Sequence, residues 1–189
     1  MKSIAENDAT YARRRRLRSY AEMESGLQMT VRELTVADHP RVIELNQASV
    51  VELSQLDEQR LHYILALAHR SLVIEQDGEV LAFALAVAPG TDYDSANYIQ
   101  LAKQFESFLY LDRIAVAESA RRHGFGAALY DAMEASAVPF GRMVCDVNIE
   151  PLNEASLAFH QARGYQPVGQ LEHGDVKTVV LLSKELGGA

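Results

Sequence analysis

Two adjoining pieces of sequence decide the fold of this chain: FLYLDRIAV at residues 108–116 and RRHGFG at residues 121–126. The first is rich in β-branched, aromatic and aliphatic residues and contains no strand breaker, which predicts a central strand. After the second piece, apolar and small residues recur on one face of a 3.6-residue period. We therefore expect a strand, a short turn and an amphipathic helix packed on the sheet. The residues of that face are Phe125, Leu129, Ala132, Met133 and Ser136.

The turn between strand and helix has the features of an anion site. Gly124 and Gly126 allow the backbone to come close to a ligand, and the first N–H groups of a helix lack partners within the helix. The positive end of the helix dipole adds attraction, and pyrophosphate is a common ligand of such turns. The alternative is that the two glycines only form the turn.

Comparison with known phosphate-binding motifs shows which of them residues 121–126 fit. A Walker loop would need Gly-Lys-Ser/Thr after the glycines, and the dinucleotide fingerprint would need a third glycine where residues 127–129 read AAL. The pattern that fits is Arg/Gln-x-x-Gly-x-Gly/Ala after a strand, filled by Arg121, Gly124 and Gly126 five residues beyond Val116. In this pattern the chain resembles the GNAT superfamily of N-acetyltransferases, in which the pyrophosphate of coenzyme A lies on this turn.

A second motif supports the same resemblance. Residues 153–165 read NEASLAFHQARGY, which is similar to the superfamily signature Asn-x-x-Ala-x-x-aromatic-Tyr-x-x-x-Gly-Phe. The two motifs lie about 30 residues apart, each in the expected structural context, and together they are more specific than either alone. This segment also predicts a helix ended by Gly164. Its expected buried stripe is Ala155, Ala158, Phe159 and Ala162.

The remaining elements predict a mixed α/β fold. Two apolar runs joined through Asp77-Gly78 indicate a hairpin over residues 72–87, and Asp57 is placed to cap a helix. We expect one central mixed sheet of six to seven strands with helices on both faces, which is also the order of elements that the resemblance implies. The other expected strands are 30–34, 142–147, 165–168 and 176–182, and the other expected helices are 37–50, 57–68 and a short one that ends at Lys103.

Composition and charge favour one acidic domain. At 189 residues and 48% hydrophobic content the chain is long enough for one well-cored domain and too short for two ordinary ones. Residues 1–28 hold six basic and four acidic residues, so 12 basic and 22 acidic residues remain for residues 29–189. We expect residues 1–28 to be a flexible basic extension and residues 29–189 to be the acetyltransferase domain. An acidic body favours cationic acceptors such as amines and disfavours nucleic acid. A nucleic-acid-binding arm around residues 13–18 is the alternative.

Other classes of protein are not indicated. The single cysteine, Cys145, excludes an intrachain disulfide, and no apolar run of 18 residues suggests a membrane span. The six histidines show no metal-ligand spacing. We expect a cytoplasmic protein without metal or membrane partner, and the sequence leaves its oligomeric state open, with a homodimer among the options.

The resemblance implies a set of residues that bind acetyl-CoA. The turn amides would hold the pyrophosphate, with Arg121 setting the turn or adding charge. The strand at 108–116 would splay from the strand at 142–147 and leave main-chain groups free for the pantetheine arm. Asn153 would contact the cofactor or, alternatively, only cap its helix. The turn residues are Arg122, His123, Gly124, Phe125, Gly126 and Ala127, and the strand residues are Ile114, Ala115 and Val116.

Proton transfer needs an acid and a base, for which several residues compete. His160 stands where the superfamily usually has the tyrosine that protonates the leaving thiolate, and its ordinary pKa allows it to donate a proton near neutrality. Its alternative is a half-exposed helical residue, and Tyr110, Tyr93 and Tyr98 are rival donors. The candidate bases are Asp112, Asp146 and Glu75, whereas Cys145 is read as a small core residue.

The function that the resemblance implies is transfer of an acetyl group from acetyl-CoA to a primary amine by direct attack. The acceptor would be a small-molecule or peptide amine, and residues 89–105 would form its loop or lid unless they are an insertion without a role. The alternative is a non-catalytic sensor or assembly module that binds acyl-CoA, which the unusual His160 motivates.

Overall fold

A seven-stranded sheet organises the chain in the computed structural model, which describes residues 29–50, 53–174 and 176–187. Its strands are β1 (Met29–Glu33), β2 (Ala68–Gln76), β3 (Glu79–Val87), β4 (Leu109–Val116), β5 (Arg142–Glu150), β6 (Gln166–His173) and β7 (Lys177–Glu185). They lie in the order β1-β2-β3-β4-β5-β7-β6, and only the β4–β5 pair is parallel. The predicted mixed sheet of six to seven strands is confirmed.

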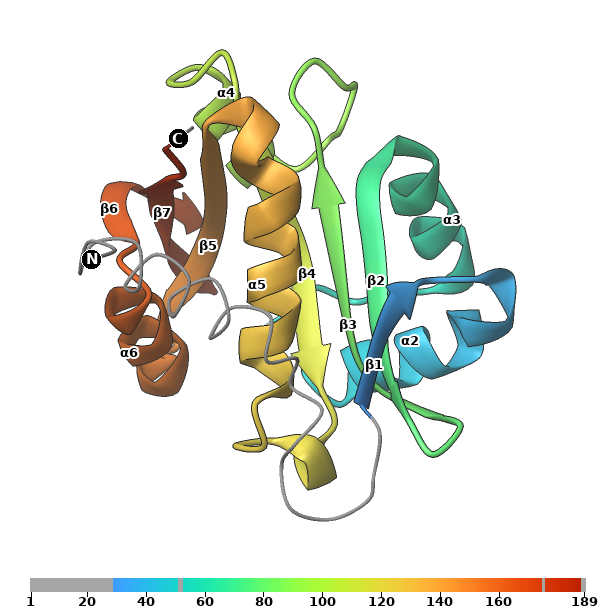
Figure 1. The fold of residues 1–189 in the computed structure, drawn as a ribbon. Coiled ribbons are helices and arrows are strands. Elements are labelled where there is room, and N and C mark those ends of the chain that lie inside the picture. The colour runs from blue at the N-terminus through green and yellow to red at the C-terminus, as the bar shows by residue number, and fades with distance from the viewer. Residues whose placement is uncertain (1–28, 51–52, 175, 188–189) are drawn as a thin grey trace, which may run out of the picture.

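Helices cover both faces of this sheet. The five α-helices of the described ranges are α2 (His39–Gln47), α3 (Glu58–Leu67), α4 (Ala96–Ala102), α5 (Phe125–Ala137) and α6 (Glu154–Ala162). In Figure 1, α5 runs along β4, α6 lies beside β5, and α2 and α3 group beside β1 and β2. Every residue of β3 from Ala82 to Val87 is buried, and successive side chains of a strand point to opposite faces. Both faces of the sheet centre are therefore packed against other elements.

Local sequence signals account for several of these elements. Asp77 and Gly78 adopt the left-handed backbone that a two-residue hairpin turn needs. Asp57 caps α3 by accepting a hydrogen bond from the Arg60 amide at 2.7 Å. The apolar face of α5 is buried at Phe125 and Leu129, as the helical spacing predicted. Strand β2 begins at Ala68, directly after α3, and β6 continues to His173, beyond the strand expected at 165–168.

The basic extension expected at residues 1–28 lies outside the described residues. In the described part of the chain, no helix combines the length and the apolar character needed to cross a membrane.

Candidate active site

The turn that follows β4 presents an open cradle of main-chain amides. Gly124 has φ +86° and α5 begins at the next residue. Among the described residues, the N–H groups of residues 122–127 donate to no main-chain carbonyl, and the first helical bond of α5 is from Ala128 to Gly124 at 2.9 Å. A side chain at Gly124 would meet nothing within 4 Å, and at Gly126 only a Val116 methyl group at 4.0 Å. The glycines thus leave space beside unpartnered amides at a helix N-terminus, which fits a pyrophosphate.

Arginines flank this cradle in two different ways. Arg121 is exposed and its Nε lies 3.4 Å from the Val116 carbonyl oxygen, so it folds back over the turn. Arg122 is exposed and adopts φ +65°, a left-handed backbone that is uncommon for a residue with a side chain. Such backbone conformations are concentrated at ligand-binding turns.

Strands β4 and β5 pair only at their beginnings. The parallel ladder contains the pairs Leu109–Met143 and Tyr110–Val144 and no later one. On its other edge β4 pairs with β3 through Val116. The β5-facing edge of β4 therefore lacks a strand partner at residues 114–116, where the sequence predicted main-chain groups for the pantetheine arm.

Asn153 caps α6, which was the simpler of its two expected roles. Its Oδ1 accepts a hydrogen bond from the Ser156 amide at 3.1 Å. The cap uses the side-chain oxygen, and the Nδ2 group makes no hydrogen bond to a described residue. The same side chain can cap the helix and donate to a ligand.

His160 lies in an aromatic box and is not the half-exposed residue that was one of its two interpretations. It is only 4% exposed, and the rings of Tyr130, Phe159 and Tyr165 surround it. Its Nδ1 lies 2.7 Å from the Ser156 carbonyl oxygen, which can only accept, so Nδ1 carries the proton. Its Nε2, 2.5 Å from the Tyr130 hydroxyl, therefore accepts. Burial lowers the pKa of His160, and the ring is neutral.

The buried stripe expected for α6 was wrong at its three alanines, and only Phe159 packs against the core as expected. His160 is buried and Ser156 and Leu157 are partly buried, whereas the three alanines of the expected stripe are exposed. The aromatic rings on α5 and at Tyr165 rotate the helix so that the histidine faces them. An alanine side chain buries too little apolar surface to favour the opposite orientation of the helix. The exposed members are Ala155, Ala158 and Ala162.

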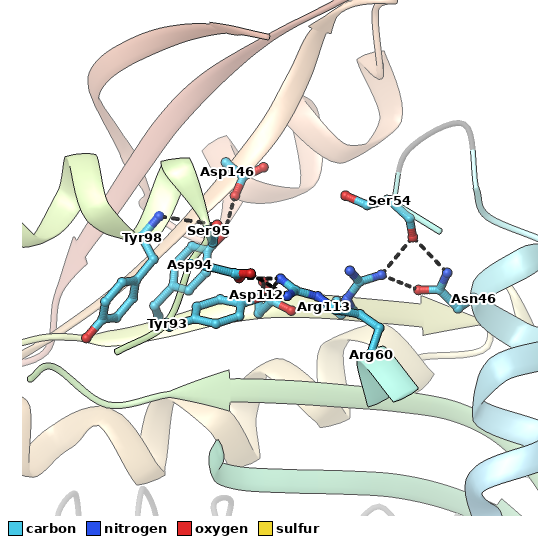
Figure 2. A network of polar contacts seen from close by, with 11 residues as sticks. Asn46, Ser54, Arg60, Tyr93, Asp94, Ser95, Tyr98, Asp112, Arg113 and Asp146 are labelled. Atoms are coloured by element: carbon cyan, nitrogen blue, oxygen red, sulfur yellow. Dashed lines mark hydrogen bonds and ion pairs between the residues drawn. The ribbon is translucent and has the colours of Figure 1, made fainter. Parts of the chain in front are cut away.

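Two tyrosine–aspartate pairs lie where β4 and β5 part, and Figure 2 labels three of their members, Tyr93, Asp112 and Asp146. The Tyr93 hydroxyl donates to Asp112 Oδ1 at 2.6 Å, and the Tyr110 hydroxyl donates to Asp146 Oδ1 at 2.7 Å. The Tyr93 and Tyr110 rings lie 6.4 Å apart, with Tyr98 against both. The structure therefore brings together five of the residues proposed as acid or base.

Burial sets the protonation behaviour of these pairs. Desolvation raises the pKa of Asp112, against the opposing effects of the Arg113 guanidinium and the Tyr93 hydrogen bond. Desolvation also raises the pKa of Asp146, opposed mainly by the hydrogen bond from Tyr110. The pKa of Tyr110 is raised well above its ordinary value by burial and by the nearby carboxylates. Both aspartates are thus shifted toward neutral pH, where a base for an amine operates.

The other candidates lie elsewhere. Glu75 on β2 forms an ion pair with Arg32 at 2.7 Å, two strands away from β4. Cys145 is buried, and burial raises the pKa of its thiol, as expected for a core residue. Within the described ranges, no three histidine, cysteine or carboxylate side chains are grouped so that they could hold a metal ion.

Helix α3 holds the loop before α4 over this network. Arg60 donates to both carboxylate oxygens of Asp94, at 2.8 and 2.7 Å. The Tyr63 hydroxyl donates to the Asp92 carbonyl at 2.9 Å. An open surface pocket of about 490 Å³ lies between this loop and α4, lined by Tyr93 and Ile99 among others. The loop expected to contact the acceptor therefore borders both this pocket and, through Tyr93, Asp112.

Sequence reasoning missed Arg113 and Arg60. Arg113 follows Asp112 in a strand and would ordinarily point to the opposite face, so its contact with Asp112 at 3.2 Å could not be read from spacing. Arg60 is 34 residues from Asp94, and no local pattern joins them. The one signal in the sequence for the second contact was that acidic residues occur in the loop before α4 and an arginine occurs on α3.

Known proteins resemble this chain in sequence family and in fold. Residues 31–165 match the family model described as the acetyltransferase (GNAT) family. No curated protein sequence matches the chain. Among solved structures, Ard1 from Thermoplasma volcanium has a TM-score of 0.69 at 17% identity, covering 85% of this chain and 99% of its own. The ribosomal-protein-S18-alanine N-acetyltransferase from Escherichia coli has a TM-score of 0.65 at 16% identity, covering 86% and 96%.

One similar structure was solved with the cofactor. The yncA protein from Salmonella typhimurium, in complex with acetyl-CoA, has a TM-score of 0.64 at 20% identity, covering 85% of this chain and 95% of its own. At these low identities the similar structures establish only the fold, and membership of the family is established by the match of residues 31–165 to the family model.

Proposed function

Because the chain belongs to the acetyltransferase (GNAT) family, we propose that it moves the acetyl group of acetyl-CoA to a primary amine by direct attack on the thioester. The family makes the chain an acyltransferase that uses acetyl-CoA. The observation that carries the proposal is the amide cradle at residues 122–127, next to the unpaired edge of β4. An anion site and an open strand edge lie side by side, as a long substrate with a diphosphate and an amide-containing arm requires.

Binding would use main-chain groups for the most part. The amides of residues 122–127 would hold the pyrophosphate, with the exposed Arg122 adding charge. The unpaired groups of β4 at Ile114, Ala115 and Val116 would bond the pantetheine arm and polarise the thioester carbonyl. The Nδ2 group of Asn153 would donate to the same arm from α6. Acetyl-CoA supplies an activated thioester, whose acetyl group is transferred and whose sulfur departs.

Asp112 is the proposed base. Its carboxylate receives hydrogen bonds from Tyr93 and Arg113, and its raised pKa keeps it an effective proton acceptor near neutrality. As the amine nitrogen forms its bond to the acetyl carbon, the amine proton passes to Asp112, directly or through water. An acceptor that arrives as an ammonium group first gives one proton to solvent, and the neutral nitrogen then gains the acetyl group and loses a second proton to Asp112.

Tyr110 is the proposed donor of the proton that the departing sulfur takes up. Its hydroxyl spans from β4 to Asp146 on β5, beyond the last pair of the ladder, at the point where the strands part. The surroundings of His160 support a different role, since both of its ring nitrogens have partners within the chain and its ring is neutral. His160 would fix α6 against α5 and so hold Asn153 beside the unpaired strand edge.

The acceptor would enter beside the loop that α3 holds. The pocket next to Tyr93 offers aromatic and aliphatic surface, and its lining carries both Asp92 and Lys103. Asp92 would receive the amine of a small molecule or peptide, and the apolar surface would take its apolar portion. Amino acids, polyamines and peptide N-termini all satisfy this description.

The experiment that tests the proposal is thiol release from acetyl-CoA by the full chain with a panel of amines: lysine, spermidine and short peptides with free N-termini. We expect release above the hydrolysis background with at least one amine, and an acetylated product found by mass spectrometry. Asp112→Asn serves as the matched variant. Thiol release that is equal with and without every amine would contradict the proposal.

A further inference from the structure

Arg113 is a buried cation that joins three parts of the fold. It is 5% exposed, and its Nε donates to Asp112 Oδ2 at 3.2 Å. Its NH1 group donates to Asn46 Oδ1 on α2 at 2.9 Å and to the Ser54 carbonyl before α3 at 2.7 Å. Asn46 also donates to that carbonyl, at 2.9 Å. Figure 2 shows the guanidinium between Asp112 and these two acceptors. A buried guanidinium with partners on both sides fixes each of them.

A β-bulge makes this arrangement possible. Leu85 on β3 pairs with Arg113 and Ala86 pairs with Leu111, so Asp112 is the extra residue of β4. Neighbouring side chains of a regular strand point to opposite faces, but an extra residue changes that alternation. Asp112 and Arg113 can therefore form an ion pair although they are adjacent in sequence. Their side chains are 7% and 6% exposed, so water screens the pair little.

Other groups also face Asp112; some of them favour ionisation of its carboxyl group and others oppose it. Tyr93 from the loop before α4 donates to it, and Arg60 on α3 is a more distant cation paired with Asp94. Asp146 on β5 opposes ionisation of Asp112, and it carries the hydrogen bond from Tyr110. Arg113 is the cation in direct contact with Asp112, and Asp112 is its only carboxylate partner among the ion pairs of the described residues.

We propose that Arg113 is a positioning residue for acetyl transfer, which holds the Asp112 carboxylate ionised and oriented and ties it to the end of α2. The effect of Arg113 on catalysis rests on the proposed function, in which Asp112 is the base. Two of the three bonds of Arg113 reach α2 and the segment that follows it, so movement of that part of the chain would move the base. Arg113 touches neither reacting atom and acts through Asp112 alone.

The direct test is the titration of the Asp112 carboxyl carbon by ¹³C NMR, assigned with Asp112→Asn, in the protein without acetyl-CoA or amine. Arg113→Gln removes the cation and should raise the midpoint by about one pH unit or more, because an adjacent opposite charge lowers a carboxyl pKa by about 1–3 units. Arg41→Gln on α2 removes an arginine that pairs with Glu79 instead, and should leave the midpoint unchanged. An unchanged midpoint in Arg113→Gln would overturn the proposal.

Arg113→Lys covers the case in which the glutamine variant does not fold. A lysine keeps the charge but cannot reproduce the planar fork that reaches three acceptors. We expect a smaller rise of the midpoint in the same direction, and a midpoint equal to wild type would overturn the part of the proposal that assigns orientation of Asp112 to the fork, since the retained charge alone would then be sufficient. The titration is independent of turnover, so its result stands even if the amine panel fails. Where turnover is found, the acid limb of kcat/KM should move to higher pH by the same amount in Arg113→Gln.

Discussion

The Tyr110 hydroxyl lies 2.7 Å from Asp146 Oδ1 and bridges β4 and β5 just beyond the last pair of their ladder. The contact joins two strands at the place where their main chains cease to pair. It places the Tyr110 hydroxyl, on a side chain that is 1% exposed, beside the gap that the pantetheine arm would occupy, with the Asp146 carboxylate as its acceptor. Much of the proposed chemistry depends on this placement.

Tyr110→Phe should lower kcat by about 10²-fold or more, which is the usual contribution of a positioned acid or base. The KM for acetyl-CoA should change little, because the cradle at residues 122–127 is untouched. Steady-state kinetics at saturating amine measure both. Tyr98→Phe is the matched control, since Tyr98 is also buried and its hydroxyl donates only to the loop carbonyl of Ala88. Equal losses of kcat in both variants would refute the role of Tyr110.

Asp112→Asn should reduce kcat/KM at neutral pH by about 10²- to 10⁴-fold and remove the acid limb of the pH profile. The amide cannot accept the amine proton; its oxygen can still accept from Arg113, while its NH2 group can only donate, to the Tyr93 hydroxyl oxygen. Because the pKa of Asp112 is raised in the folded chain, ionising it costs stability as pH rises above its ordinary value. Asp112→Asn should therefore be less destabilising at pH 7 than at pH 4 relative to wild type, which urea unfolding at the two pH values measures. A loss of stability that is larger at pH 7 would contradict the raised pKa.

His160 should make the free energy of unfolding decrease as the pH falls below about 6.5, the ordinary pKa of histidine. The pKa of His160 in the folded chain is lowered from 6.5, so just below pH 6.5 the unfolded chain binds a proton at this residue and the folded chain does not. Its contribution is fully present above pH 6.5 and is lost as pH falls below that value. His160→Gln keeps an acceptor for Tyr130 but cannot titrate, so its free energy of unfolding should fall less than that of wild type between about pH 7 and pH 5. Parallel curves for the two proteins would contradict the buried neutral ring.

Arg60→Gln should weaken acceptor binding without affecting acetyl-CoA. The Arg60–Asp94 pair is partly exposed, with side chains 29% and 60% accessible, so its contribution is about 1 kcal/mol or less. The KM for the amine should rise by up to about fivefold, and Asp94→Asn should have a similar effect. The double variant should be no worse than either single one. Additive increases in KM would show that the two residues act separately.

Local chemistry made much of the fold predictable. Asp77-Gly78 specifies a hairpin turn by itself, and the glycines at 124 and 126 mark a turn whose helix follows from its own apolar spacing. The order of helices and strands along the chain agreed with the family resemblance. The position and openness of the cradle could therefore be expected from the sequence.

The side-chain network could not be predicted, because it depends on long-range register. The bulge that gives Asp112 and Arg113 a common direction exists only in the pairing of β4 with β3. The orientation of α6 depends on Tyr130 and Tyr165, which lie on other elements and bury His160 in place of the alanines. Helical periodicity alone favoured the alanines because they are apolar, although they bury little surface.

The most direct measurement is the affinity for acetyl-CoA, by isothermal titration calorimetry, of wild type, Gly124→Glu and Gly78→Glu. Both glycines have positive φ and face open space, so the two variants introduce the same strain and charge at different turns. The carboxylate at position 124 would occupy the cradle and repel the diphosphate, so we expect at least a hundredfold weaker binding there and unchanged binding in Gly78→Glu. Equal affinity in all three proteins would contradict the claim that the turn after β4 holds the cofactor.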